Sequence, residues 1–149
     1  MLRTRQLRGL IVAGLATFGF FCVFTGAAGG QQTELIARGR VTYRVYCRNC
    51  HGDVGKGDGK LVEILRSTPA DLTQISKKND GTFPFDRVYK IIDGRQEVVS
   101  HGDMPLWGQA FQESTGNEDE TRGKILQLIE FLKSIQDGGT KQAAAKPGS

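Results

Sequence analysis

The chain has 149 residues, of which 20 are Lys or Arg and 16 are Asp or Glu, so its formal net charge is +4. Three of the cations, Arg3, Arg5 and Arg8, stand at the N-terminus, and residues 29–149 carry a net charge of only +1. A nearly neutral body gives no basis for nucleic-acid binding, and the length allows one domain of ordinary size plus extensions.

The N-terminal segment has the form of an export signal. Residues 1–9 are basic and polar, and residues 10–28 contain no charge. Small residues at 26–28 offer a cleavage site, but the uncharged run is also long enough to cross a bilayer as a helix. We expect residues 1–28 to be a signal peptide or an N-terminal membrane anchor. In both cases the arginines stay cytoplasmic and the rest of the chain lies in the periplasm.

The first amphipathic helix is predicted to begin at Thr33. A threonine suits an N-cap, and Glu34 after it suits the positive end of a helix. Four residues then follow at spacings of four, which places them along one stripe of the helix. They are Leu35, Gly39, Tyr43 and Cys47.

The middle of the chain predicts one long loop and two helical segments. Residues 51–60 contain four glycines and are expected to form a loop. Proline suits a first helical turn, so a short helix is expected at residues 69–72. Residues 84–93 carry apolar side chains at helical spacing, and Gly94 is placed to end that helix.

The last helix is predicted from about residue 118 to residue 136. Asn117 and Glu120 have the spacing of a capping box, and Gly138 offers a C-terminal stop. The apolar face consists of Ile125, Leu128, Ile129, Leu132 and Ile135.

The fold class expected from these patterns is all-α, since no stretch of any length alternates as a strand does. The export segment ends at residue 28, and residues 29–137 are expected to form a single domain. Residues 138–149 have no apolar face and are expected to form a flexible tail.

Two cysteines followed by a histidine form the most specific motif in the chain. Cys47 and Cys50 are three residues apart, and His51 follows directly. This spacing is the attachment signature of a c-type haem, a haem bound covalently through two thioethers. The cysteines can reach the two vinyl groups on one porphyrin edge, and the histidine can ligate the iron from one face. We therefore expect one covalent haem c.

Other uses of this motif fit less well. A structural zinc site needs four ligands in a tetrahedron, and only Cys47, Cys50 and two histidines are at hand besides Cys22 in the uncharged run. A thioredoxin-like thiol pair requires a βαβ context, which the sequence does not predict.

Met104 is the expected second axial ligand of the iron. It is the only methionine besides Met1, and it lies in a polar, glycine-containing segment followed by Pro105. A thioether ligand favours the reduced iron, and the proline stiffens the loop that holds it. Packing in a core is the commoner use of methionine, and His101 is a competing ligand three residues away.

The residues from about 34 to 136 resemble a class I c-type cytochrome. The resemblance rests on Gly39 and Tyr43, the segments CRNCHGDVGKGDG and MPLWG, and the apolar closing helix. It implies a helical cytochrome c fold wrapped around one haem, with Gly39 where the first and last helices cross. It further implies that a carbonyl near Pro69 orients His51, and that Trp107 and Arg95 contact the haem propionates.

The expected function is one-electron transfer in the periplasm or at the outer face of the cytoplasmic membrane, by a carrier and not an enzyme. Donors and acceptors would be redox proteins, namely membrane respiratory complexes or a dehydrogenase. A haem subunit that feeds or drains an oxidoreductase complex is the main alternative, and a membrane anchor at residues 10–28 would favour it. A haem gas sensor or a peroxidase-like enzyme needs an open iron site, which a ligating Met104 would close.

Overall fold

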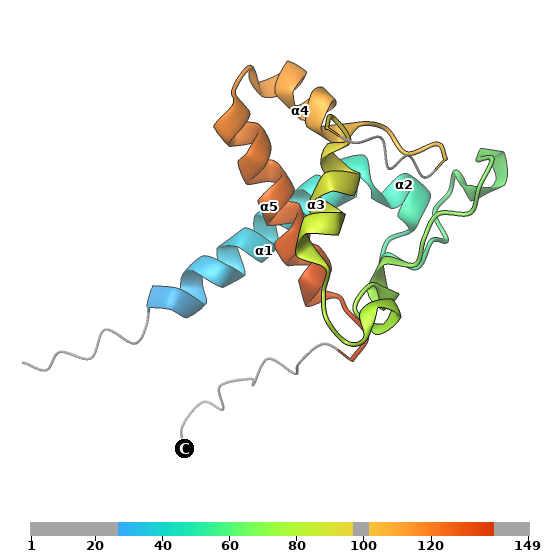
Figure 1. Ribbon diagram of the computed structural model, residues 1–149, viewed down its shortest axis with the longest axis horizontal. Coiled ribbons are helices and arrows are strands. Elements are labelled where there is room, and N and C mark those ends of the chain that lie inside the picture. Colours follow the sequence, from blue (N-terminus) through green and yellow to red (C-terminus); the bar gives the residue numbers. More distant parts are fainter. Residues whose placement is uncertain (1–26, 97–101, 139–149) are drawn as a thin grey trace, which may run out of the picture.

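The structure, a computed structural model, describes residues 27–96 and 102–138, and within them it consists of helices and loops without a strand (Figure 1). The all-α prediction is therefore confirmed for this part of the chain. The α-helices in the described residues are α1 (Ala27–Tyr46), α2 (Arg48–His51), α3 (Phe85–Asp93), α4 (Trp107–Thr115) and α5 (Glu118–Ser134). Three short 3₁₀ helices lie between α2 and α3, namely η1 (Val62–Ile64), η2 (Leu72–Gln74) and η3 (Lys77–Asn79).

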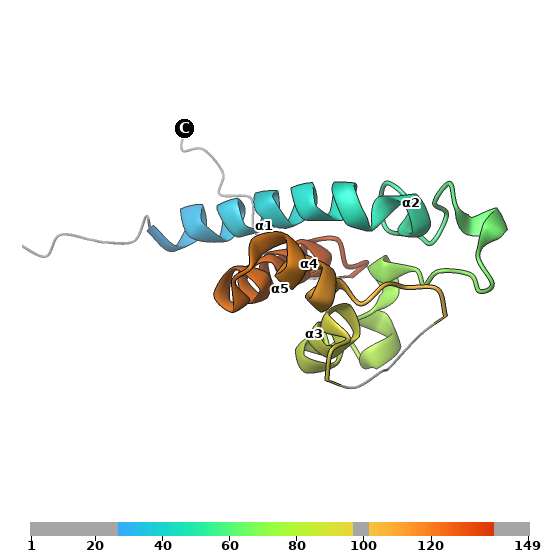
Figure 2. The same ribbon diagram turned by 90° about the horizontal axis from the view of Figure 1, so that it is seen from above.

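Helices α1 and α5 cross at Gly39, as predicted from the resemblance (Figure 1). A Cβ added at Gly39 would overlap the backbone carbonyl of Gln127 and approach the Cβ of Phe131, so only glycine allows this close approach. One turn further along α1, the ring of Tyr43 packs against that of Phe131, with 5.1 Å between the ring centroids. Helices α3 and α4 lie on the α5 side of α1, whereas α2 follows at the end of α1 (Figure 2).

Helix α1 begins earlier than the sequence predicts. It is already helical at Ala27, so Thr33 lies inside the helix and is not its N-cap. The Thr33 hydroxyl donates a hydrogen bond to the carbonyl of Gly29, four residues back, so this polar side chain is satisfied inside the helix.

Helices α3 and α5 form where the periodicity predicts them. Gly94 ends α3 in the left-handed conformation with φ of 68°, as expected. At the start of α5, the side-chain oxygen of Asn117 accepts hydrogen bonds from the backbone N–H groups of Asp119 and Glu120. Asn117 is therefore the N-cap that the sequence predicts.

The C-terminal end of α5 differs from the prediction, because α5 stops at Ser134 and Gly138 does not cap it. Gln136 explains the early end. Its side chain accepts a hydrogen bond from the backbone N–H of Ser76 and donates to the carbonyls of Leu72 and Leu132. These bonds tie the end of α5 to the segment around η2.

Helix α4 was not predicted from the sequence. Its glycine and polar residues make the apolar pattern too short to recognise in the sequence. In the structure Trp107 and Phe111 lie one turn apart and stack, with 6.0 Å between ring centroids. Gly108 lies so close to Asp93 and Arg95 that a Cβ would overlap the Asp93 carboxylate. The helix is therefore stabilised by tertiary packing more than by its own pattern.

The core is apolar and lies around α5, which contributes five of its nine buried hydrophobic residues. These nine are Tyr43, Val88, Ile92, Phe111, Ile125, Leu128, Ile129, Phe131 and Leu132. Four of the five positions predicted as the apolar face of the last helix are among them, and Ile135 packs against the same cluster.

In the part of the chain that the structure describes, no helix is both long and apolar enough to cross a membrane. The predicted signal peptide or anchor at residues 1–28 falls almost wholly outside the described residues, as does most of the tail predicted at residues 138–149.

Candidate functional site

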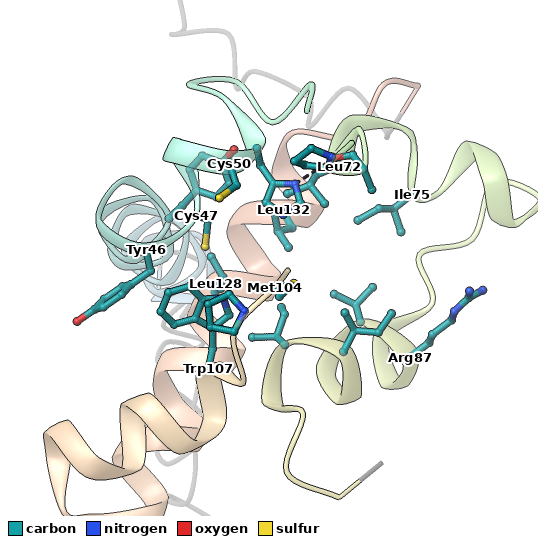
Figure 3. A pocket seen from close by; sticks show the side chains of 18 of the residues that line it. Tyr46, Cys47, Cys50, Leu72, Ile75, Arg87, Met104, Trp107, Leu128 and Leu132 are labelled. Atoms are coloured by element: carbon teal, nitrogen blue, oxygen red, sulfur yellow. Dashed lines mark hydrogen bonds between the residues drawn. The ribbon is translucent and has the colours of Figure 1, made fainter. Parts of the chain in front are cut away.

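A cavity of about 370 Å³ lies between α2, α3 and the segment that precedes α4. This volume is within the usual range for small-molecule and cofactor sites. Its walls are mainly apolar, with Leu72 and Ile75 on one side and Leu128 and Leu132 of α5 at the back (Figure 3). Cys47, Cys50, His51 and Met104 all line it, so the fold brings the predicted ligands to one cavity.

The two cysteines lie next to each other on one wall (Figure 3). Cys47 precedes α2 and Cys50 lies within it, and a turn of helical hydrogen bonds spans them, including the bond from the His51 N–H to the Cys47 carbonyl (2.9 Å). Both side chains are half-buried, and the two cysteines do not form a disulfide with each other. Burial, and secondly the neighbouring Cys50, raise the pKa of Cys47 to about 12. This thiol is therefore protonated at neutral pH, unlike the low-pKa thiols of redox-active pairs.

His51 is buried, with 8% of its surface exposed, and its ring is held by the backbone. Ring atom Nδ1 lies 3.0 Å from the carbonyl oxygen of Ala70. A carbonyl can only accept, so Nδ1 carries the proton and the lone pair is on Nε2. A histidine that ligates a metal is typically oriented in this way by a carbonyl.

The carbonyl that orients His51 belongs to Ala70, in the segment that Pro69 is predicted to mark. Pro69 does line the cavity, but its own carbonyl packs against Gly57, where a Cβ would overlap it. Gly57 has φ of 81°, and its N–H donates to the His51 carbonyl at 2.9 Å. The backbone of the glycine-rich loop therefore lies against the Pro69 carbonyl, and the Ala70 carbonyl is the one that meets the histidine ring.

Met104 is half-buried and lines the same cavity, in the segment between Gly102 and the start of α4. The preceding residue, Asp103, is held by Arg66: the Arg66 Nε donates to its Oδ1 and the Arg66 backbone N–H donates to its Oδ2, both at 2.7 Å. These bonds hold the pKa of Asp103 below its ordinary value. The competing ligand, His101, lies outside the described residues.

Trp107 and Arg95, the predicted propionate contacts, are placed differently. Trp107 lines the cavity and packs edge-on against Tyr46, with 5.3 Å between ring centroids. Arg95 is not among the residues that line the cavity. Its guanidinium instead pairs with Asp93 and Glu118 and joins the end of α3 to the start of α5. The attraction raises the pKa of Arg95 and holds that of Glu118 below its ordinary value.

Two cations that the sequence analysis missed do line the cavity, Lys78 of η3 and Arg87 of α3. Arg87 lies on the side of the cavity away from the cysteines (Figure 3). The periodicity of α3 places Arg87 on the same helical face as Val88 and Ile91. The sequence does not indicate, however, which group this charge would contact. These cations could meet anionic groups at that end of a ligand.

The donors around the cavity are an imidazole, a thioether and two adjacent thiols. Across residues 27–96 and 102–138, no three His, Cys, Asp or Glu side chains gather in a group suited to a bare metal ion, so a zinc site of the usual kind is not formed there.

Comparison of the chain with protein-family models, with curated proteins and with solved structures gave no match.

Proposed function

We propose that this protein binds one haem covalently through Cys47 and Cys50, with His51 and Met104 as axial ligands of the iron, and that it transfers single electrons in the periplasm or at the outer face of the cytoplasmic membrane. The proposed fold family is that of the class I c-type cytochromes. The observation that carries the proposal is that both thiols, His51 and Met104 line one apolar cavity.

The cysteine pair supports covalent attachment. The two side chains lie on one wall, as thiols that meet the two vinyl groups of one porphyrin edge must do. Each thiol would add across a vinyl double bond, so that one S–C and one C–H bond form while the S–H bond and the vinyl π bond break. The addition is redox-neutral and needs no oxidant.

The remaining residues suit the two faces and the far edge of a porphyrin. The Ala70 carbonyl fixes the His51 tautomer that places the lone pair on Nε2. Met104 offers a thioether from a different segment of the chain, and Arg87 and Lys78 offer cations for carboxylates. The propionates would lie at the porphyrin edge away from the two vinyl groups, so we assign them to these cations and not to Arg95.

When bound, the haem supplies the one-electron couple, and a thioether ligand raises its potential. The chain supplies the surroundings. Leu72, Ile75, Leu128 and Leu132 exclude water, and the hydrogen bonds on His51 and Asp103 restrain the two ligand segments. Restrained ligands in an apolar cavity change little in position when the iron changes charge, which favours rapid electron transfer.

We infer a carrier ahead of the other haem functions, because a ligating Met104 leaves no vacant position for a gas or peroxide. Its partners would be redox proteins, either membrane respiratory complexes or a dehydrogenase. A haem subunit within an oxidoreductase complex uses the same site and remains the alternative, and retention of residues 10–28 as an anchor would favour it.

Haem staining after denaturing electrophoresis tests covalent attachment. The protein from its own host should give a stained band, and Cys22→Ser should keep it. Cys47→Ser combined with Cys50→Ser should abolish the stain. Because this variant also loses core-forming contacts, the wild type is extracted with acid–acetone in parallel. Release of all haem from the wild type would contradict the proposal.

A further inference from the structure

The segment from Leu65 to Ala70 reaches both proposed axial ligands. At its end, the Ala70 carbonyl binds the His51 ring, and at its start Arg66 binds Asp103, the neighbour of Met104. We propose that Arg66 is a positioning residue that keeps Met104 on the iron and thereby controls how readily outside molecules reach the metal. This inference rests on the proposed function.

Arg66 and Asp103 form three contacts on one carboxylate. The Arg66 backbone N–H donates to Oδ2, Nε donates to Oδ1, and Nη2 lies 2.7 Å from Oδ1. The Asp103 side chain is only 21% exposed, although that of Arg66 is 85% exposed. Isolated surface ion pairs contribute little, but here two guanidinium nitrogens contact Oδ1 while the backbone N–H contacts Oδ2, so both oxygens of the carboxylate are held by one residue.

A second contact joins the same two segments. Gly102 has φ of 69°, and a Cβ there would overlap the hydroxyl of Ser67. Residues 66–67 therefore pack directly against residues 102–103. Ser67 lies in van der Waals contact with Gly102, and Arg66 forms the ion pair with Asp103. The two contacts are independent. The first depends on the absence of a side chain at Gly102, and the second depends on the carboxylate of Asp103.

This placement restrains Met104 from its N-terminal side. Asp103 is fixed directly before it, Pro105 restricts the backbone directly after it, and α4 begins at Trp107. Between two fixed neighbours the thioether has few ways to leave. Without the Arg66 side chain one of these anchors is weakened, so the sulfur should leave the iron more often and let another ligand bind.

Ligand substitution at the iron tests the proposal. Imidazole binding to the ferric protein and carbon monoxide binding to the ferrous protein both require the Met104 sulfur to leave first. Arg66→Ala keeps its backbone bond to Asp103 and should bind both ligands roughly three- to tenfold faster than the wild type. Asp103→Ala loses all three contacts and should be faster still. The double variant should match Asp103→Ala, because Arg66 then has no partner left to lose.

Arg38→Ala is the matched control, since it removes an arginine from an exposed ion pair, with Glu34 at 2.7 Å, on the distant helix α1. It should bind both ligands at the wild-type rate, and all variants should keep the haem stain. Arg66→Lys keeps the charge without the second prong and should fall between the wild type and Arg66→Ala. Should Arg66→Ala lose its haem, Arg66→Lys alone decides the matter.

Wild-type rates in Arg66→Ala or, if that variant loses haem, in Arg66→Lys would overturn the positioning role while leaving the haem site intact. Failure of the proposed function looks different. In that case the wild type itself carries no covalent haem, or it binds carbon monoxide at once because Met104 is not a ligand.

Discussion

The backbone of Gly39 in α1 lies against the carbonyl oxygen of Gln127 in α5, with no room for a Cβ between them. Gly39→Ala should therefore lower the free energy of unfolding by roughly 1–3 kcal/mol, because the overlap is with backbone and the two helices must move apart. The measurement is urea unfolding of the haem-loaded protein.

Gly123→Ala is the matched control for that experiment. Gly123 also lies inside a helix, α5, and has no neighbouring atom within 4 Å of an added Cβ. Alanine is a better helix former there, so this variant should gain up to about 1 kcal/mol. Equal effects of the two substitutions would mean that Gly39 does not lie at the crossing.

Gln136→Ala should destabilise the protein by roughly 1–3 kcal/mol, because it removes the partners of the buried Ser76 N–H and the partly buried Leu72 carbonyl. Gln109→Ala loses only an exposed contact to Glu113 and should change stability by less than about 0.5 kcal/mol. Thermal unfolding of both variants checks this. An effect of Gln136→Ala no larger than that of Gln109→Ala would remove the assigned link between α5 and the η2 segment.

Glu118 should contribute to acid sensitivity. Its pKa is held below the ordinary value of 4.5, first by the hydrogen bond from Arg95 and then by the charges of Arg95 and Arg122. A lowered folded-state pKa means that the stabilisation is complete above the unfolded value and is lost as the pH falls through the folded one. Asp93, which also faces Arg95, keeps part of the guanidinium paired.

The check is the free energy of unfolding at pH 6 and at pH 3 for the wild type and Glu118→Gln. The wild type should lose more stability over that interval, because glutamine has no proton to take up. Identical losses would mean that the Arg95 pair does not lower the pKa of Glu118 in solution.

Arg87→Gln should lower the midpoint potential of the proposed haem. A cation at the cavity wall favours the reduced iron, which carries one positive charge less than the oxidised iron. Arg122→Gln, which removes an exposed arginine of α5, should leave the potential near the wild-type value. Redox titration of both variants decides the matter, and equal potentials would contradict the placement of Arg87 beside the haem.

The elements that the sequence predicts well are those whose signals are local. Helix α3 ends at Gly94 and α5 begins at Asn117 because a left-handed glycine and a capping side chain act on their own turn. The cysteine pair and His51 are equally local, since a single turn of the chain at α2 fixes their relative placement. The role of Gly39 was predicted from the resemblance, because the residues around it in the sequence do not indicate which helix crosses α1 there.

What the sequence missed depends on contacts between distant segments. The end of α5 is set by Gln136 bonding to residues 60 and 64 positions earlier in the chain. The segment at Pro69 is predicted by the resemblance, but the fold decides which of its carbonyls meets His51, and it is that of Ala70. Arg95 could not be told from Arg87 by pattern, since only the fold decides which arginine meets Glu118 and which one lines the cavity.

The measurement that tests the account most directly is the far-red absorption of the ferric protein, where sulfur ligation to the iron gives a weak charge-transfer band. The wild type should show the band, Met104→Ala should lose it and bind carbon monoxide readily once reduced, and His101→Ala should keep it. The opposite pattern, with the band absent from the wild type and the iron opened by His101→Ala but not by Met104→Ala, would mean that two histidines hold the iron and that Met104 only lines the cavity.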